Sequence, residues 1–168
     1  LFAELYRSLL LTKDRDLQSI YLQSAFEQSH EIDRLYFTKL ILHGMDYPII
    51  STKALLKYAI DFCTYPQWLW DQSYAEVKDW NETISLCVAH TEIKNSNLSF
   101  HVIIDELIAL PVKQNHIDWI KRYWTLLSPD EVWFFNKLIV GGIKSIDIHD
   151  SIAVGFRKEI KIPIPLLQ

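Results

Sequence analysis

Apolar residues recur every three or four positions along most of this chain. Two such stripes consist of Leu17, Ile20, Tyr21 and Ala25, and of Ile117, Ile120, Trp124 and Leu127. Side chains at this spacing lie on one face of an α-helix, so the pattern predicts a series of amphipathic helices. The chain has only four glycines and six prolines and contains no Asn-Gly or Asp-Gly pair, which leaves little material for β-hairpin turns. We therefore predict an all-α protein.

The pattern divides the chain into about ten predicted helices. They cover approximately residues 1–10, 17–25, 32–44, 51–62, 67–77, 79–90, 100–110, 116–127, 128–140 and 149–160. The clearest boundary is the sequence SPDE, in which Ser128 can cap a helix, Pro129 suits its first position and Glu131 can reach back to the cap. The polar stretch 91–97 separates halves of about 1–92 and 98–168 but is too short to tether two domains. We expect one domain covering residues 1–168.

Composition narrows the range of functions. The formal net charge of −4 disfavours a strongly basic nucleic-acid binder but allows a few cations on one face. The chain lacks a run of about 18 apolar residues, so we predict no membrane contact. Cys63 and Cys87 stand apart, which is typical of a reduced compartment, with a single disulfide as the alternative. The histidines are scattered, so we predict no metal site. We also expect the protein to be cytoplasmic and monomeric.

One hexapeptide occurs almost unchanged in both halves. KLILHG begins at residue 39, and KLIVGG begins at residue 137, 98 positions later. Each copy is predicted to end a helix, with its lysine at the surface, its aliphatic residues packed inward and a glycine at the stop. Because helix ends are chemically alike, the likeness has a purely architectural interpretation. The other interpretation is an internal duplication with pseudo-twofold symmetry.

The segments that follow the two copies favour a functional interpretation. Each copy leads through a short turn into another predicted helix, so backbone amides and a helix N-terminus are expected at the surface. Phosphate groups bind at such places, and glycine lets the backbone approach them closely. Two related units can contact the two strands of a DNA duplex. The candidate residues are Gly44, Ser51, Thr52, Lys53 and Lys57 in the first half, and Gly141, Gly142, Lys144, Ser145, Arg157 and Lys158 in the second.

Three segments carry a resemblance to a known family. The segment SYAEVKDWNETISL (73–86) resembles SY-x-x-V-G-D-x-x-E-T, and NKLIVGGIKS (136–145) resembles KL-x-T-G-x-x-R-V-G, both from bacterial ATP-dependent DNA ligases. The first 26 residues are similar to the start of the same family in their arrangement of a helix, a threonine and a basic turn. The resemblance covers essentially the whole chain in order. Lys144 stands where the family has arginine, and the glycine expected shortly afterwards is absent.

The resemblance implies the N-terminal, all-α DNA-binding domain of such a ligase. That domain is pseudo-twofold and grips the minor groove beside a nick through phosphate and sugar contacts, ahead of nucleotidyltransferase and OB-fold domains that use ATP and Mg²⁺. No K-x-D-G tetrapeptide occurs in this chain, so we expect neither a catalytic residue nor a cofactor within it. We expect it to be part of a longer protein, with nicked duplex DNA and the catalytic domains as its partners.

Two further interpretations stay open at this stage. A helical repeat-type module that binds proteins is the alternative function, and it predicts an apolar groove in place of cations at the glycine turns. The aromatic residues Trp68, Trp70, Tyr74 and Trp80 form a second ambiguous feature. Their spacing favours packing in the core or against another domain over stacking on bases.

Overall fold

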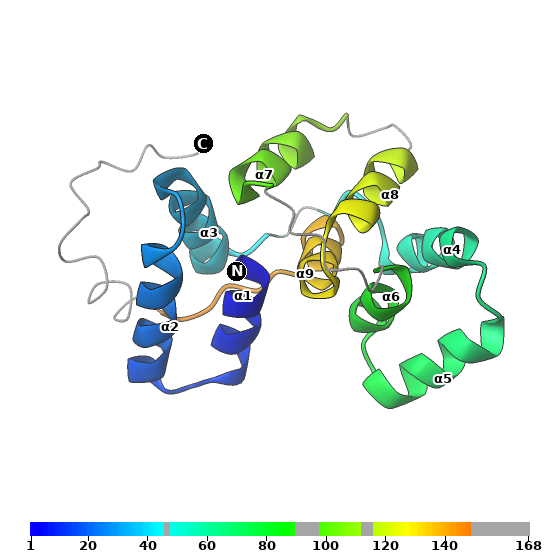
Figure 1. Cartoon of the computed structure of the whole chain (residues 1–168), viewed down its shortest axis with the longest axis horizontal. Coiled ribbons are helices and arrows are strands. Elements are labelled where there is room, and N and C mark those ends of the chain that lie inside the picture. Colours follow the sequence, from blue (N-terminus) through cyan, green and yellow to red (C-terminus); the bar gives the residue numbers. More distant parts are fainter. Residues whose placement is uncertain (46–47, 90–97, 112–115, 149–168) are drawn as a thin grey trace.

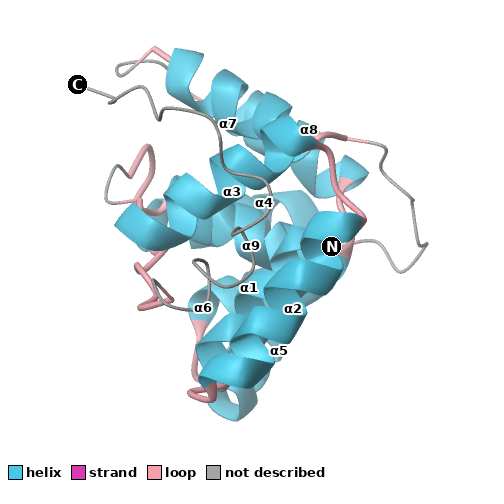
Figure 2. Cartoon of the chain, turned by 90° about the vertical axis from the view of Figure 1, so that its left-hand side faces the viewer, coloured by secondary structure: helices cyan, strands magenta, loops and turns pink. Residues whose placement is uncertain are grey.

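The computed structural model describes residues 1–45, 48–89, 98–111 and 116–148, and within them the chain forms nine α-helices and no β-strand (Figure 1). The helices are α1 (Phe2–Leu11), α2 (Arg15–Glu27), α3 (Glu31–His43), α4 (Thr52–Cys63), α5 (Gln67–Val77), α6 (Trp80–Val88), α7 (Phe100–Ala109), α8 (Ile117–Leu126) and α9 (Pro129–Ile139). The side view of the same ranges shows helices joined by loops (Figure 2). The all-α prediction is confirmed. The predicted helix at 149–160 lies outside the described residues.

The helix boundaries are set by local capping. Asp14 accepts hydrogen bonds from the first-turn amides of α2, and Ser51 does the same for α4. At α9 the Ser128 hydroxyl accepts from the Glu131 amide, and the Glu131 carboxylate accepts from the Ser128 amide, so the predicted capping box is present. Each bond satisfies an amide that the helix itself leaves without a partner. These starts are therefore determined by residues next to them in the sequence.

The helix α9 forms the centre of the core. Figure 1 shows it between α1 on one side and α6 on the other. Its sequence is apolar nearly all round, and Val132, Trp133, Phe134, Phe135, Leu138 and Ile139 are all buried. The buried polar residue Asn136 accepts a hydrogen bond of 2.9 Å from the indole of Trp124. Because α1 and α6 come from the first half of the sequence and α9 from the second, the two halves are interleaved.

The ambiguous aromatic residues divide into two kinds. Trp70 is fully buried, and Tyr74 stacks on Trp80 with ring centroids 4.0 Å apart. Trp68, in the first turn of α5, leaves 63% of its surface exposed. Packing within the domain is therefore confirmed for three of the four. Both cysteines are free thiols, and the Cys63 thiol donates to the carbonyl oxygen of Cys87 at 3.3 Å.

None of the helices in the described ranges has the length and apolar character needed to cross a membrane.

Candidate nucleic-acid interface

The two glycine turns lie against each other. The amide of Met45, next to the first turn, donates to the carbonyl oxygen of Ile143, next to the second, at 3.0 Å in an antiparallel bridge. A Cβ atom added to Gly44 would lie 2.9 Å from that same oxygen. Segments 98 positions apart in the sequence, from residues 39 and 137, thus meet backbone to backbone. The structure brings together the two predicted glycine turns.

The segment that follows each glycine turn covers the end of the helix that leads into the other turn. The amide of Ile146, beyond α9, donates to the Ile41 carbonyl near the end of α3 at 2.7 Å. Reciprocally, the amides of Ile49 and Ile50, beyond α3, donate to the Ile139 carbonyl at the end of α9 at 2.9 and 3.3 Å. We call residues 44–45, 48–50 and 141–146 the glycine crossing. Its reciprocal bonds are the arrangement that a duplicated, pseudo-twofold unit predicts.

The glycines make the crossing possible. Gly44 has a φ of 71° and Gly141 a φ of 69°, in the left-handed region that residues with a side chain rarely adopt. Pro48 packs on Gly141, where an added Cβ would lie 3.2 Å from the Pro48 ring. Gly142 does not have a positive φ of this kind, so the left-handed glycine comes one position earlier in the second copy than in the first. Glycine is needed here because one backbone segment approaches another closely.

The prediction that the turn amides are available for phosphate is wrong at the glycines. The amide of Gly44 donates to the Leu40 carbonyl at 2.8 Å, and that of Gly142 to the Lys137 carbonyl at 2.8 Å. The amide of Gly141 donates to the Leu138 carbonyl at 3.2 Å. These bonds satisfy the last carbonyl groups of α3 and α9, which need partners at any helix end. A phosphate at this surface would therefore be held mainly by side chains.

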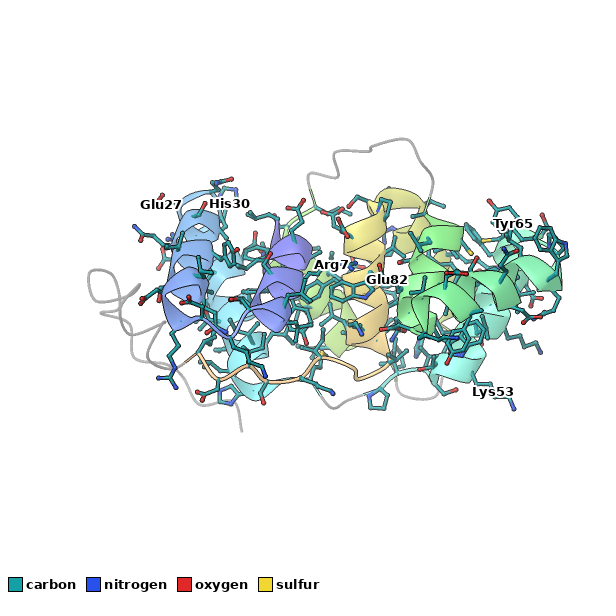
Figure 3. The ribbon with its side chains drawn as sticks, turned by 90° about the horizontal axis from the view of Figure 1, so that it is seen from below. Arg7, Glu27, His30, Lys53, Tyr65 and Glu82 are labelled. Atoms are coloured by element: carbon teal, nitrogen blue, oxygen red, sulfur yellow. The ribbon has the colours of Figure 1, made fainter. Side chains whose placement is uncertain are left out.

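Exposed cationic and hydroxyl side chains flank the crossing. Lys144 and Ser145 are exposed within it, and Lys53 and Lys57 are exposed on α4. The bonds from Ile49 and Ile50 to α9 place the start of α4 next to the second glycine turn. In Figure 3 the segment after α9 runs along the lower edge of the view, and Lys53 projects from that edge. These predicted residues lie on elements that the crossing joins.

The remaining predicted residues differ in their surroundings. Ser51 caps α4, with its hydroxyl oxygen accepting from the Ala54 amide at 3.3 Å, and Thr52 is half-buried beside it. Arg157 and Lys158 lie outside the described residues. Across the described part of the chain, no salt bridge joins Lys53, Lys57 or Lys144 to a carboxylate. The Asp147 carboxylate, next to the crossing, lies 3.9 Å from the Arg15 guanidinium, and both side chains are largely exposed.

The lysine of the second hexapeptide is not at the surface, contrary to prediction. Lys137 leaves only 16% of its side chain exposed and lies 3.2 Å from the Asp79 carboxylate. Its ammonium group also lies 5.2 Å from the centre of the Trp133 ring. The prediction failed because the position faces α6, which packs on α9, and helical spacing within one segment does not show what packs there. Lys137 is therefore a structural cation.

The acidic motif at the start of α6 fixes three helices together. Asp79 caps α6 by accepting from the amides of Asn81 and Glu82, and its other oxygen holds Lys137 of α9. Glu82 accepts two hydrogen bonds, at 3.0 and 3.1 Å, from Arg7 of α1. Figure 3 shows the side chains of Arg7 and Glu82 pointing toward each other. The D-x-x-E part of segment 73–86 thus acts here through helix capping and ion pairs.

Arg7 is a residue that the sequence did not single out. Its guanidinium group also pairs with Asp130 at 3.2 Å and lies 4.1 Å from the centre of the Trp133 ring. A planar guanidinium can make all these contacts at once, which an ammonium cannot. The only sequence signal was a lone cation in α1, a helix that also contains Glu4 and Ser8. That signal is common to many surface helices, so it does not identify the residue.

The Asp79–Lys137 pair gives a pH-dependent prediction. Burial opposes the charged form of Asp79, but the nearby Lys137 ammonium and the amides of Glu82 and Asn81 outweigh it, so its pKa lies below the ordinary value of 3.8. A lowered pKa in the folded state means that the carboxylate stabilises the protein above about pH 4, and that this contribution is lost as the pH falls through the folded-state pKa.

We expect Asp79→Asn to lower the free energy of unfolding by about 1 kcal/mol at neutral pH, because asparagine still caps a helix but cannot pair with Lys137. The modest size reflects an Asp79 side chain that is 41% exposed and so partly screened by water. Urea unfolding of both proteins at about pH 7 and about pH 3 measures the difference. A difference that stays the same at both pH values would contradict the assigned role of the charge.

No family model and no curated protein matches the chain. In the described ranges, no group of three or more histidine, cysteine, aspartate or glutamate residues is placed to hold a metal ion.

Proposed function

We propose that this chain binds duplex DNA without reading its sequence, and that the glycine crossing is the contact surface. The observation that carries the proposal is the meeting of the two hexapeptide copies through the Met45–Ile143 bridge. The two strands of a duplex are themselves related by twofold axes. A reciprocal surface with one exposed lysine beyond each turn, Lys144 and Lys53, suits two phosphate backbones at once.

The chemistry of the surface favours phosphates over bases. Lysine presents a compact positive charge and lacks the fork that allows arginine to make paired bonds. Phosphate contacts give affinity and position but carry no sequence information. Ser145 and Ser51 add hydroxyl groups that can donate to phosphate oxygens. The small number of cations, on a chain with a net charge of −4, implies weak binding by this chain alone.

The resemblance in segments 73–86 and 136–145 extends the proposal to a parent enzyme. We propose that the chain holds nicked DNA for the nucleotidyltransferase and OB-fold domains of a bacterial ATP-dependent DNA ligase, in the cytoplasm and as a monomer. Those domains would supply ATP, Mg²⁺ and the lysine that takes up AMP. Tethering to them raises the effective concentration of DNA at the crossing, so weak contacts suffice.

Binding of fluorescently labelled DNA tests the proposed function. We expect the protein to bind two nicked duplexes of unrelated sequence with dissociation constants within about twofold of each other, because phosphates are alike in both. Raising the salt from about 50 to about 200 mM should weaken binding to both duplexes in parallel. The logarithm of the association constant should fall by about 0.9 per unit of log salt for each phosphate neutralised. Fluorescence anisotropy measures both effects. Absence of binding at low salt, or a strong preference for one sequence, would contradict the proposal.

A second candidate function is supported by one observation. A groove is lined by Met45, Pro48 and Ile49 of the crossing together with Leu107, Ile108, Leu110 and His116, and most of these side chains are apolar. Ile108 leaves 69% of its surface exposed there. A groove of this kind is what a helical protein-interaction module would present. The lysines at the crossing favour DNA, and mapping the bound surface separates the two candidates.

A further inference from the structure

The hydroxyl group of Tyr6 bonds to both backbone polar groups of Lys144. The Lys144 amide donates to the Tyr6 oxygen at 3.0 Å, and the Tyr6 hydroxyl donates to the Lys144 carbonyl at 3.4 Å. The two residues are 138 positions apart, so the contact joins α1 to the end of the second glycine turn. A single buried side chain thereby orients the backbone amide and the backbone carbonyl of one exposed residue.

The Tyr6 ring is itself fixed by the core. The residue leaves 1% of its surface exposed, and its ring lies 5.2 Å from that of Phe134 and 6.1 Å from that of Trp133. Burial raises the pKa of Tyr6 above its ordinary value of 10.0, while the bond to Lys144 acts in the opposite direction. The hydroxyl is therefore protonated at neutral pH and able to donate. A rigid ring ending in a protonated hydroxyl is well suited to hold a backbone segment in place.

The Tyr6 contact lies between two other fixed points of the same segment. Ile143 is tied to Met45, and Ile146 is tied to Ile41, in both cases by bonds between backbone groups. Between these two points, the backbone of Lys144 is held by the Tyr6 side chain. Phenylalanine at position 6 would keep the ring and remove only the hydroxyl. The contact can therefore be removed while the crossing stays intact.

We propose that Tyr6 is a positioning residue for DNA binding, which holds Lys144 in the orientation that meets a phosphate. This inference rests on the proposed function. Tyr6 does not reach the surface and acts through the Lys144 backbone. Ordering one backbone residue in advance removes an entropic cost from binding, and this corresponds to a change in affinity of roughly fivefold.

The test compares Tyr6→Phe, Lys144→Ala and the double variant in binding to a labelled nicked duplex. We expect Tyr6→Phe to weaken binding roughly fivefold in the wild-type background and less than about twofold in the Lys144→Ala background, because its effect passes through that lysine. The matched control is Tyr123→Phe, which removes another buried hydroxyl, bonded to Glu106 at 2.8 Å. This control should leave the DNA affinity unchanged.

Hydrogen exchange of the Lys144 amide, read by NMR without DNA, tests the contact separately. We expect faster exchange at this amide in Tyr6→Phe and an unchanged rate at the Met45 amide. If Lys144→Ala weakens binding but Tyr6→Phe does not, the positioning role is wrong and the proposed function stands. If Lys144→Ala has no effect, the proposed DNA surface itself is wrong. Equal effects of Tyr6→Phe in both backgrounds would show a general structural role and also overturn the inference.

Discussion

Replacing Gly44 by alanine is expected to lower the free energy of unfolding by about 3 kcal/mol. Two costs combine at this position. Gly44 has a φ of 71°, which strains a residue with a side chain, and its added Cβ would lie 2.9 Å from the Ile143 carbonyl oxygen and 3.1 Å from the Ser145 amide nitrogen. Both neighbours are backbone atoms of the crossing and cannot rotate away. Either the turn or the bridge to Ile143 must therefore shift.

Gly142→Ala is the matched control for this change. Its backbone does not have a positive φ of that kind, and the nearest atoms to an added Cβ lie 3.5 Å away, at ordinary contact distance. We expect a change in the free energy of unfolding of less than about 1 kcal/mol, of either sign. Urea unfolding followed by tryptophan fluorescence measures both variants. Equal effects at the two glycines would show that the close backbone contact is not what requires Gly44.

The second large effect is expected on DNA binding. Changing Lys53 and Lys144 together to glutamate should weaken binding to every duplex roughly 100-fold at low salt, because two attractions to phosphate become repulsions. The weakening should be the same for unrelated sequences, since these lysines do not read bases. The dependence of log K on log salt should also become less steep, by about 0.9 for each phosphate that the variant no longer neutralises. Fluorescence anisotropy at two salt concentrations gives both quantities.

A control variant must change the net charge by the same amount elsewhere. Lys78 directly follows α5 and Lys121 lies on α8, and neither residue bonds to a residue of the crossing among the hydrogen bonds and salt bridges of the described chain. Lys78→Glu/Lys121→Glu therefore reverses two charges away from the proposed surface. We expect this variant to bind at most about fivefold more weakly, from the change in overall charge alone. If the control and the test variant weaken binding equally, the crossing is not the site of contact.

Local signals in the sequence predicted the helices well. The capping box at Ser128 and the stop at Gly44 both depend on residues a few positions apart, and both are present. The turns that end the two hexapeptides contact each other in the structure, through the Met45–Ile143 bridge. The shift of the left-handed glycine from the sixth position of the first copy to the fifth of the second was not predictable, because the second copy has glycine at both positions.

Interactions between distant segments account for the failures. Lys39 and Lys137 occupy the same place in the two hexapeptides, and Lys137 is drawn to the Asp79 carboxylate because α6 packs against α9 at that point. The turn amides are a different case, because their bonds to Leu40, Lys137 and Leu138 are local. A glycine at a helix stop is itself a signal that the turn amides bond to the last carbonyl groups of the helix. Tyr6 has the sequence features of any core aromatic residue. Its hydroxyl has a role only because the folded chain places Lys144, at the end of the second turn, in contact with it.

The most direct test of the central claim is an NMR titration of the isotopically labelled protein with a nicked duplex. If DNA binds at the glycine crossing, the backbone resonances of Lys144, Ser145 and residues 51–53 should shift together as DNA is added. Those of Ile108, in the apolar groove, and of Trp68, in the first turn of α5, should stay in place. Shifts that avoid residues 144–145 and 51–53 would contradict the account. If such shifts gather at Leu107, Ile108 and Leu110, they would support the protein-interaction alternative.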